Sequence, residues 1–208
     1  MLYIALGILV VAVIVIALVL YFKNARTGGE TGFFELLFTP EHKLAGTYGE
    51  RVAQRLVEGV LHEDDRLVTN VQIEFDGKPA EMDCVVVNKY GVFIIEVKNY
   101  SGCIVGGEED YEWLKYKTSR GGNTYEKTVK NPIKQVKRQV WILARYLDYY
   151  GMGAWVEGYS ILLQGNSPVE SPYILNSAEE IDRAIHTSSR KMLDAKTVEE
   201  IAELLKTE

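Results

Sequence analysis

The fold of this chain is decided by one stretch, Asp83-Cys-Val-Val-Val-Asn-Lys-Tyr-Gly-Val-Phe-Ile-Ile-Glu-Val-Lys98. Two almost continuously apolar runs, residues 84–87 and 92–95, are separated by the turn residues Asn88-Lys89-Tyr90-Gly91. Such runs around a glycine-containing turn predict a β-hairpin. Because neither run has a polar face, we expect both strands, over 82–88 and 91–97, to be covered on both sides of a sheet.

The flanking sequence extends this hairpin into an alternating pattern of helices and strands. Upstream, apolar residues at helical spacing predict a helix over 46–62, and a strand follows over 67–75. Downstream, we expect a weak strand over 111–117, a loop over 118–124, a helix from Asn131-Pro132 to Gly151 and a strand over 156–163. Two further helices are expected over 177–185 and 197–206. They start with the capping pairs Ser177/Glu180 and Thr197/Glu200. The order indicates an α/β domain with a mixed sheet.

Three charged residues interrupt the buried strands of the hairpin: Asp83, Glu96 and Lys98. Residues two apart in a strand share a face, so Glu96 and Lys98 point the same way, and a short turn places Asp83 close to Glu96. Two carboxylates at a sheet end can hold a hard cation such as Mg²⁺. A lysine beside them can orient a water or stabilise charge on a phosphate. The alternative is a surface ion pair, worth about 0–1 kcal/mol.

This hairpin resembles the core of the PD-(D/E)xK nuclease superfamily and, more closely, the nuclease-related domain, NERD. The resemblance extends to Gly46-Thr-Tyr-Gly-Glu50, which matches the Gly-x-x-Gly-Glu pattern of the first helix. It also extends to Asn131-Pro-Ile-Lys-Gln135, which matches an Asn-Pro helix start followed by a glutamine. It covers about residues 41–158 and implies an αβββαβ core. Where many members have a histidine after the strand aspartate, this chain has Cys84.

The resemblance also implies a set of site residues. These are Asp83, Glu96 and the Val97 carbonyl as ligands of Mg²⁺ or Mn²⁺, Lys98 as the residue that assists the attacking water, and Glu50 and Gln135 as contacts from the two helices. Two of them have local alternatives. Thr47 and Glu50 also match a capping box, and Gln135 with Gln139 one turn later would also form a polar helix face.

Basic residues are concentrated in one window of an acidic chain. The net charge is −6, yet nine basic side chains and one acidic side chain lie between Lys115 and Arg145. Such a cluster can position a nucleic-acid backbone without reading its sequence, and the alternative is a solvated face. We expect nucleic acid, DNA in particular, to be contacted by Lys127, Lys130, Lys134, Lys137 and Arg138.

The first 22 residues contain no charged side chain and no proline. As a helix they would reach about 33 Å, enough for a bilayer core of about 30 Å, and they lack the features of a cleaved signal peptide. Lys23 and Arg26 follow the span, which predicts a cytoplasmic location for the rest. We expect a transmembrane helix over 1–22, a tether over 23–40, and a nuclease-like domain over 41–208 whose core is followed by a helical extension over 159–208.

Other chemistries lack a pattern in this sequence. The three histidines (His42, His62 and His186) and two cysteines do not have zinc-binding spacing, and no phosphate-binding loop or nucleophile elbow occurs, so no organic cofactor is expected. The predicted function is a membrane-anchored, cytoplasmic, metal-dependent phosphodiester hydrolase that acts in DNA processing. Two alternatives stay open: a non-catalytic module that holds nucleic acid near the membrane, and an interaction role without nucleic acid.

Overall fold

The computed structural model describes residues 51–52, 54–119, 121–187 and 192–206. Residues 51–52 and 54–58 are helical. The further elements are β1 (Arg66–Phe75), β2 (Lys78–Asn88), β3 (Gly91–Lys98), β4 (Cys103–Val105), β5 (Glu112–Thr118), β6 (Thr124–Lys130), α4 (Pro132–Tyr149), β7 (Val156–Leu162), β8 (Ile174–Leu175), α5 (Ala178–His186) and α6 (Ala195–Lys206). The expected transmembrane helix, the tether and Glu50 lie outside the described residues. Within the described part of the chain, no helix is long and apolar enough to cross a bilayer.

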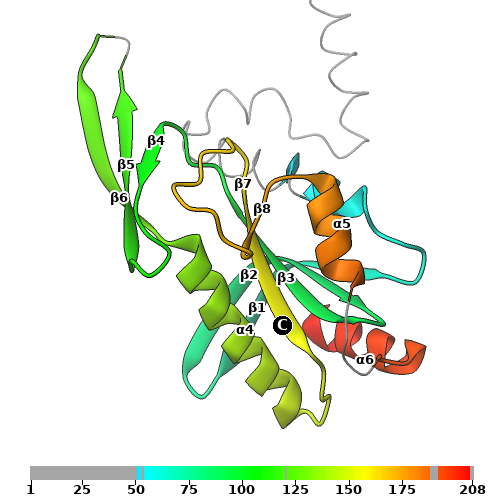
Figure 1. Ribbon diagram of the computed structural model, residues 1–208. Helices are drawn as coiled ribbons and strands as arrows, with labels where there is room; N and C mark the ends of the chain where they lie inside the picture. Colours follow the sequence, from blue (N-terminus) through cyan, green and yellow to red (C-terminus); the bar gives the residue numbers. More distant parts are fainter. Residues whose placement is uncertain (1–50, 53, 120, 188–191, 207–208) are drawn as a thin grey trace, which may run out of the picture. The chain divides into compact units, whose positions relative to one another are not determined.

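The main sheet has five strands in the order β1-β2-β3-β7-β8 (Figure 1). β1, β2 and β3 are antiparallel neighbours, and β7 and β8 run parallel to β3 and to each other. The connection from β3 to the parallel strand β7 contains α4, as parallel neighbours require a crossover. The predicted α/β domain with a mixed sheet is confirmed, and so is the hairpin formed by β2 and β3.

Helices cover both faces of this sheet. On one face, α4 and α6 pack over residues that include Val85, Val92 and Ile94. On the other face, α5 and the helix that contains Val57 pack over residues that include Phe93. The regular alternation along β3 therefore places Glu96 and Lys98 on the α4 face, beyond Val92 and Ile94.

A second, three-stranded antiparallel sheet is inserted between β3 and α4, in the order β4-β5-β6. Its base is anchored by Ile104 and Trp113, which are buried with Ile133 at the start of α4. The β5–β6 hairpin extends away from the main sheet (Figure 1). The sequence predicted β5 and the loop but not β6, because the side chains of β6 are almost all exposed and lack an apolar run.

β1 contains an irregularity at Asn70. Val68 and Val71 are three residues apart, yet both lie in the core cluster under α4. A regular strand would send them to opposite faces. Asn70 lies between them with a φ of 54°, a left-handed conformation that asparagine tolerates better than most residues. The positive φ therefore reverses the alternation of β1 at this point.

β2 changes face at the same level. Met82 and Val85, also three residues apart, both belong to the cluster under α4. β1 and β2 are paired before and after this point, but Asn70 and Asp83 are not part of the regular pairing. Asp83 is thus displaced from the regular pleat of its strand, which affects where its carboxylate points.

The two C-terminal helices have different caps. The Ser177 hydroxyl accepts the N–H of Glu180 at 3.2 Å, as predicted for α5. α6 begins earlier than predicted, because the Asp194 carboxylate accepts the N–H of Thr197 at 2.8 Å and so caps the first turn. The prediction that Thr197 caps this helix was therefore wrong.

α4 approaches the sheet closely at Gly158 of β7. A Cβ atom built on Gly158 would lie 2.5 Å from Val136 Cγ1 and 2.8 Å from Val140 Cγ2. Real carbon atoms do not approach so closely, so any side chain here must push α4 outward. Gly158 thus sets the distance between α4 and the strand that carries Glu96.

We predict that Gly158→Ala lowers the free energy of unfolding by about 1–3 kcal/mol, as overpacking does in a filled core. Chemical denaturation measures this change. Gly153→Ala is the matched control, since a Cβ there would meet nothing within 4 Å. Equal stability losses in the two variants would contradict the assigned packing role.

Candidate active site

The carboxylate of Glu96 is the centre of the candidate site. Glu96 is only 2% exposed, although it is charged and lies near the end of β3. The Lys98 ammonium, on the same face of the strand, donates to Glu96 Oε1 and forms an ion pair with it. The two-residue spacing therefore brings these side chains together, as the sequence indicated.

Two glutamines of α4 complete the surroundings of this carboxylate. Gln135 Nε2 donates to Glu96 Oε1 at 2.6 Å, and Gln139 Nε2 donates to Glu96 Oε2 at 2.7 Å. Gln139 also donates to the carbonyl of Glu81 at 2.6 Å and is only 2% exposed. The two glutamines are one helical turn apart, so they share a helix face that contacts Glu96 instead of solvent.

Gln139 is the site residue that sequence reasoning did not select. Its spacing from Gln135 was the available signal, but a polar pair on one helix face is equally typical of a surface. What distinguishes the two cases is the close approach of α4 to the sheet. The Oε1 atom of Gln139 is buried and has no hydrogen-bond partner among the described residues. A buried acceptor of this kind costs about 1–3 kcal/mol unless a water or an ion satisfies it.

Asp83 faces the same end of β3 from the neighbouring strand. The β2–β3 pairing ends at Cys84 and Ile95, and Asp83 and Glu96 are the next residues of the two strands beyond this last pair. Asp83 Oδ2 accepts the N–H of Val97 at 2.8 Å. The N–H and C=O of one strand residue point to the same side, so the Val97 carbonyl also faces the Asp83 side of β3.

These oxygens fit a hard divalent cation. Mg²⁺ prefers carboxylate and carbonyl oxygens, which Asp83, Glu96 and the Val97 backbone offer at one end of β3. The unsatisfied Gln139 oxygen adds a polar atom beside Glu96 that an ion's hydration shell could satisfy. Cys84 does not share this site, because it is buried in the cluster on the opposite face, where burial first and Asp83 next raise the pKa of its thiol to about 12.

The charge of Lys98 is maintained by its partner. Burial by itself lowers the pKa of Lys98, but the Glu96 carboxylate, through its charge and its hydrogen bond, raises it above the ordinary value. Tyr100 lies two residues further along the chain, and burial raises the pKa of its phenol. The pairing with Glu96 therefore favours the protonated, cationic form of Lys98.

The basic residues of α4 form a stripe beside this site. Lys134, Arg138, Trp141 and Arg145 recur at intervals of three and four residues and so share one face of the helix. Trp141 is 44% exposed, and Lys78 Nζ lies 4.5 Å from its ring centroid. We call these four residues, three basic side chains and Trp141, the basic stripe.

Two of the predicted nucleic-acid contacts already have acidic partners. Lys134 pairs with Glu109, and Lys137 Nζ lies 3.4 Å from Glu108 Oε1. Arg138 is exposed and forms no ion pair within the described ranges. Of the expected contacts on α4, Arg138 is therefore the one whose charge is directed to solvent without a neighbouring acid.

The remaining predicted contacts, Lys127 and Lys130, lie on β6 in the projecting hairpin. Lys127 is directly opposite Lys115 of β5. Burial lowers the pKa of Lys115, and the charges of Lys127 and Lys117 lower it further. Three like charges held together in this way are a place where an anion would be stabilising.

Asn131 joins this region to α4. Its Oδ1 accepts the N–H of Ile133 at 2.9 Å and caps the helix. Its Nδ2 donates to the carbonyls of Gly107, Glu108 and Asp110 at 3.3, 2.9 and 2.7 Å. One buried side chain thus fixes the loop that carries Glu108 and Glu109 against the start of α4. The Asn-Pro pattern therefore has a structural role here.

Comparisons with known proteins identify the family of this chain. A model of the nuclease-related domain (NERD) family matches residues 45–163, more than half of the chain. The chain therefore belongs to the nuclease-related domain family, and the resemblance read from its sequence is confirmed. It is 25% identical over 114 residues to an uncharacterized protein of Bacillus anthracis, a match that spans 54% of this chain and 53% of that protein. No solved structure matches the chain.

The structure also brings together a second group that the sequence did not indicate. His62 and His186, which are far apart in the chain, lie beside Asp65, and their ligand atoms are within 4.8 Å of one another. No short-range spacing could have revealed this group, because its members come from opposite ends of the domain sequence. It is a possible metal-binding group whose metal is not identified.

Proposed function

We propose that this chain hydrolyses phosphodiester bonds of nucleic acid in a reaction that depends on Mg²⁺ or Mn²⁺. The observation that carries this proposal is the environment of Glu96, a carboxylate that is 2% exposed and accepts hydrogen bonds from Lys98, Gln135 and Gln139. Burying a charged group is costly unless it is paired. A fold that holds this carboxylate beside Asp83 at a strand end supports a functional role, and membership of a nuclease-related family supports the reaction type.

Each site residue has a separate role in the proposed hydrolysis. Asp83, Glu96 and the Val97 carbonyl would hold the ion, which when bound supplies Lewis acidity and lowers the pKa of a coordinated water. Gln135 and Gln139 fix the orientation of the Glu96 carboxylate. Lys98 remains protonated and stabilises negative charge as a water oxygen attacks phosphorus and the P–O ester bond breaks. Glu50, outside the described residues, is proposed to reach the site from the first helix.

The substrate backbone is proposed to run along α4. Arg138 and Arg145 of the basic stripe offer phosphate contacts, and exposed Trp141 between them offers a surface for stacking. Lys127 and Lys130 on the projecting hairpin would contact the backbone further from the site, while Lys134 and Lys137 would exchange Glu109 and Glu108 for phosphates. These contacts are independent of base sequence, and DNA is the proposed substrate.

One observation favours a second candidate function. The Lys98 ammonium already neutralises the charge of Glu96, so this carboxylate does not need a metal to be paired. A non-catalytic module that holds nucleic acid on the basic stripe would keep the same arrangement. The two functions differ in whether a divalent ion binds at Asp83 and Glu96.

The test is cleavage by the full-length chain in detergent micelles. Single-stranded DNA, duplex DNA and RNA are each incubated with Mg²⁺, with Mn²⁺ and with EDTA. Cleavage that EDTA abolishes is the expected result. Binding of these nucleic acids with no cleavage under any of the conditions would instead establish the non-catalytic module.

We further propose that residues 1–22 anchor the chain in a membrane with residues 41–208 in the cytoplasm. The apolar span and the basic residues Lys23 and Arg26 that follow it support this topology. Protease added to intact cells should leave the C-terminal part whole, and it should be degraded once the membrane is permeabilised. Degradation in intact cells would reverse the proposed orientation.

A further inference from the structure

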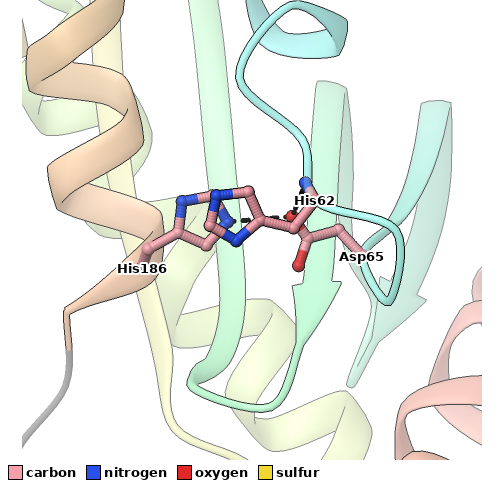
Figure 2. Close-up of side chains that lie close together, drawn as sticks. All are labelled: His62, Asp65 and His186. Carbon is pink, nitrogen blue, oxygen red and sulfur yellow. Dashed lines mark hydrogen bonds and ion pairs between the residues drawn. The ribbon is translucent and has the colours of Figure 1, made fainter.

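The group of His62, Asp65 and His186 lies at the opposite end of the sheet from Glu96. Figure 2 shows the two imidazole rings face to face beside the Asp65 carboxylate, with centroids 3.8 Å apart and an interplanar angle of 2°. His62 follows the first helix, Asp65 directly precedes β1, and His186 ends α5. His186 also contacts Tyr90 in the turn that starts β3, six residues before Glu96, or roughly 20 Å of extended strand.

The contacts of His186 are unusual for an imidazole. Its Nδ1 lies 2.6 Å from Asp182 Oδ1, and its Nε2 lies 2.8 Å from Asp65 Oδ2. A neutral imidazole carries only one N–H. If Nδ1–H donates to Asp182, the lone pair of Nε2 faces a carboxylate oxygen, and this contact is repulsive unless a cation or a second proton lies between them.

The burial of these groups makes the contact significant. The side chains of Asp65 and His186 are 5% and 9% exposed, so solvent does little to screen them. Asp65 Oδ2 also accepts the backbone N–H of His62 at 2.6 Å. That bond fixes the carboxylate in place, so that neither partner can turn away from the other without breaking a further contact.

We propose that His62, Asp65 and His186 bind one Zn²⁺ ion, with a water as the fourth ligand. Two imidazoles and a carboxylate are a typical zinc ligand set, whereas Mg²⁺ favours oxygen ligands alone. Asp182 takes the outer position commonly seen at such sites, since it accepts the Nδ1–H of His186 and leaves Nε2 as the ligand atom. The site is distinct in place and in chemistry from the carboxylate site at Glu96.

The geometry requires only small adjustments. Ligand atoms about 2.0–2.1 Å from a tetrahedral Zn²⁺ are about 3.4 Å apart, so the Nε2–Oδ2 distance of 2.8 Å must open by roughly half an ångström. The stacked His62 ring must turn to direct a nitrogen at the ion. Its side chain is 64% exposed, so the turn meets little packing. The bound ion would connect the first helix, the start of β1 and the end of α5.

The experiment measures Zn²⁺ uptake and thermal stability on the full-length chain in detergent micelles. After dialysis against Zn²⁺, elemental analysis should find one equivalent per chain, and Tm should rise by several degrees because the ion binds only the folded state. His62→Gln and His186→Asn should each lose the bound ion and the rise in Tm. His62 is exposed, so its substitution tests the site even if the His186 variant fails to fold.

Two controls separate this site from the carboxylate site. Glu96→Gln should still bind Zn²⁺ at the histidines, and a titration with Mg²⁺ should not distinguish the wild-type chain from His62→Gln. Zn²⁺ uptake that persists in both histidine variants, or that Glu96→Gln abolishes, would overturn the assignment. So would a chain that takes up no Zn²⁺ after the dialysis.

Discussion

Glu96→Gln should reduce metal-dependent cleavage by about 10³-fold or more, because the loss of a charged ligand removes several kcal/mol of transition-state stabilisation. The amide keeps the shape of the side chain, and its oxygen can still accept hydrogen bonds at one of the two positions, while its NH₂ group occupies the other. Affinity for nucleic acid without metal should be unchanged or higher, because a negative charge near the phosphates is gone. Glu74→Gln, at an exposed position of β1, is the matched control and should cleave normally.

The same substitution should change how stability depends on pH. In the wild-type chain, Glu96 raises the pKa of Lys98, so the stability from this pair is complete at neutral pH and is lost only as pH rises through a value above about 10.4. In Glu96→Gln, burial still lowers the pKa of Lys98, and it is opposed only by the smaller contributions of Tyr100 and Asp83. With its pKa lowered by burial, Lys98 should make the variant more stable as pH rises through that lowered pKa, whereas the wild-type chain should not gain stability from Lys98 as pH rises.

Lys98→Met distinguishes the metal-binding role from the electrostatic one. This variant should still bind Mn²⁺ through Asp83 and Glu96, but cleavage should fall by about 10²-fold, since a cation near the attacked phosphate is missing. Titration of Mn²⁺ by calorimetry checks the binding. Wild-type cleavage rates in both the Glu96 and Lys98 variants would show that the reaction takes place elsewhere.

Reversing the charge of Arg138 and Arg145 together should weaken duplex DNA binding at least about tenfold and reduce its salt dependence. Each phosphate contact contributes about 0.9 to the slope of log K against log salt, so two lost contacts should lower the slope by about 2. Arg138 and Arg145 are exposed on α4, and their reversal leaves the Lys134–Glu109 and Lys137–Glu108 pairs intact. Fluorescence anisotropy at several salt concentrations measures both quantities.

A pair of single substitutions on two helices controls for the change in net charge. Arg183 is exposed on α5, which covers the opposite face of the sheet from α4. Arg138→Glu and Arg183→Glu therefore alter the net charge equally but at different places. Equal losses of affinity in both would indicate a general charge effect and would remove the basic stripe from the proposed interface.

The features that depend on residues close together in the sequence could be predicted from the sequence. A period of two in β3 was enough to place Glu96 and Lys98 on one face. The Asn131-Pro132 start was enough to place α4, which begins at Pro132 and ends at Tyr149. Because Gln135 lies on that helix, its approach to Glu96 could be predicted once the helix was placed over the sheet.

The rest depends on contacts between distant residues. The left-handed conformation of Asn70 has no signal in a single sequence, so the displacement of Asp83 toward the Val97 N–H was not predictable. The acids that pair with Lys134 and Lys137 come from a loop more than 20 residues upstream. His62 and His186 likewise come together only when the sheet between them in the sequence has folded. Glu50 and the residues of the expected span stay predictions.

The irregularity at Asn70 and Asp83 also bears on how this sheet avoids aggregation. β1 is an edge strand of the main sheet, and a long regular edge strand is a template for pairing with another chain. A local break in the pleat interrupts that template. The break also opposes a shift of β1 along β2. In the observed register Asn70 and Asp83, where the side-chain alternation of each strand reverses, lie opposite each other, and a shift of one residue would place each reversal opposite regular strand. The displacement that directs Asp83 toward Val97 therefore also interrupts this edge as a pairing template and holds β1 and β2 in a single register.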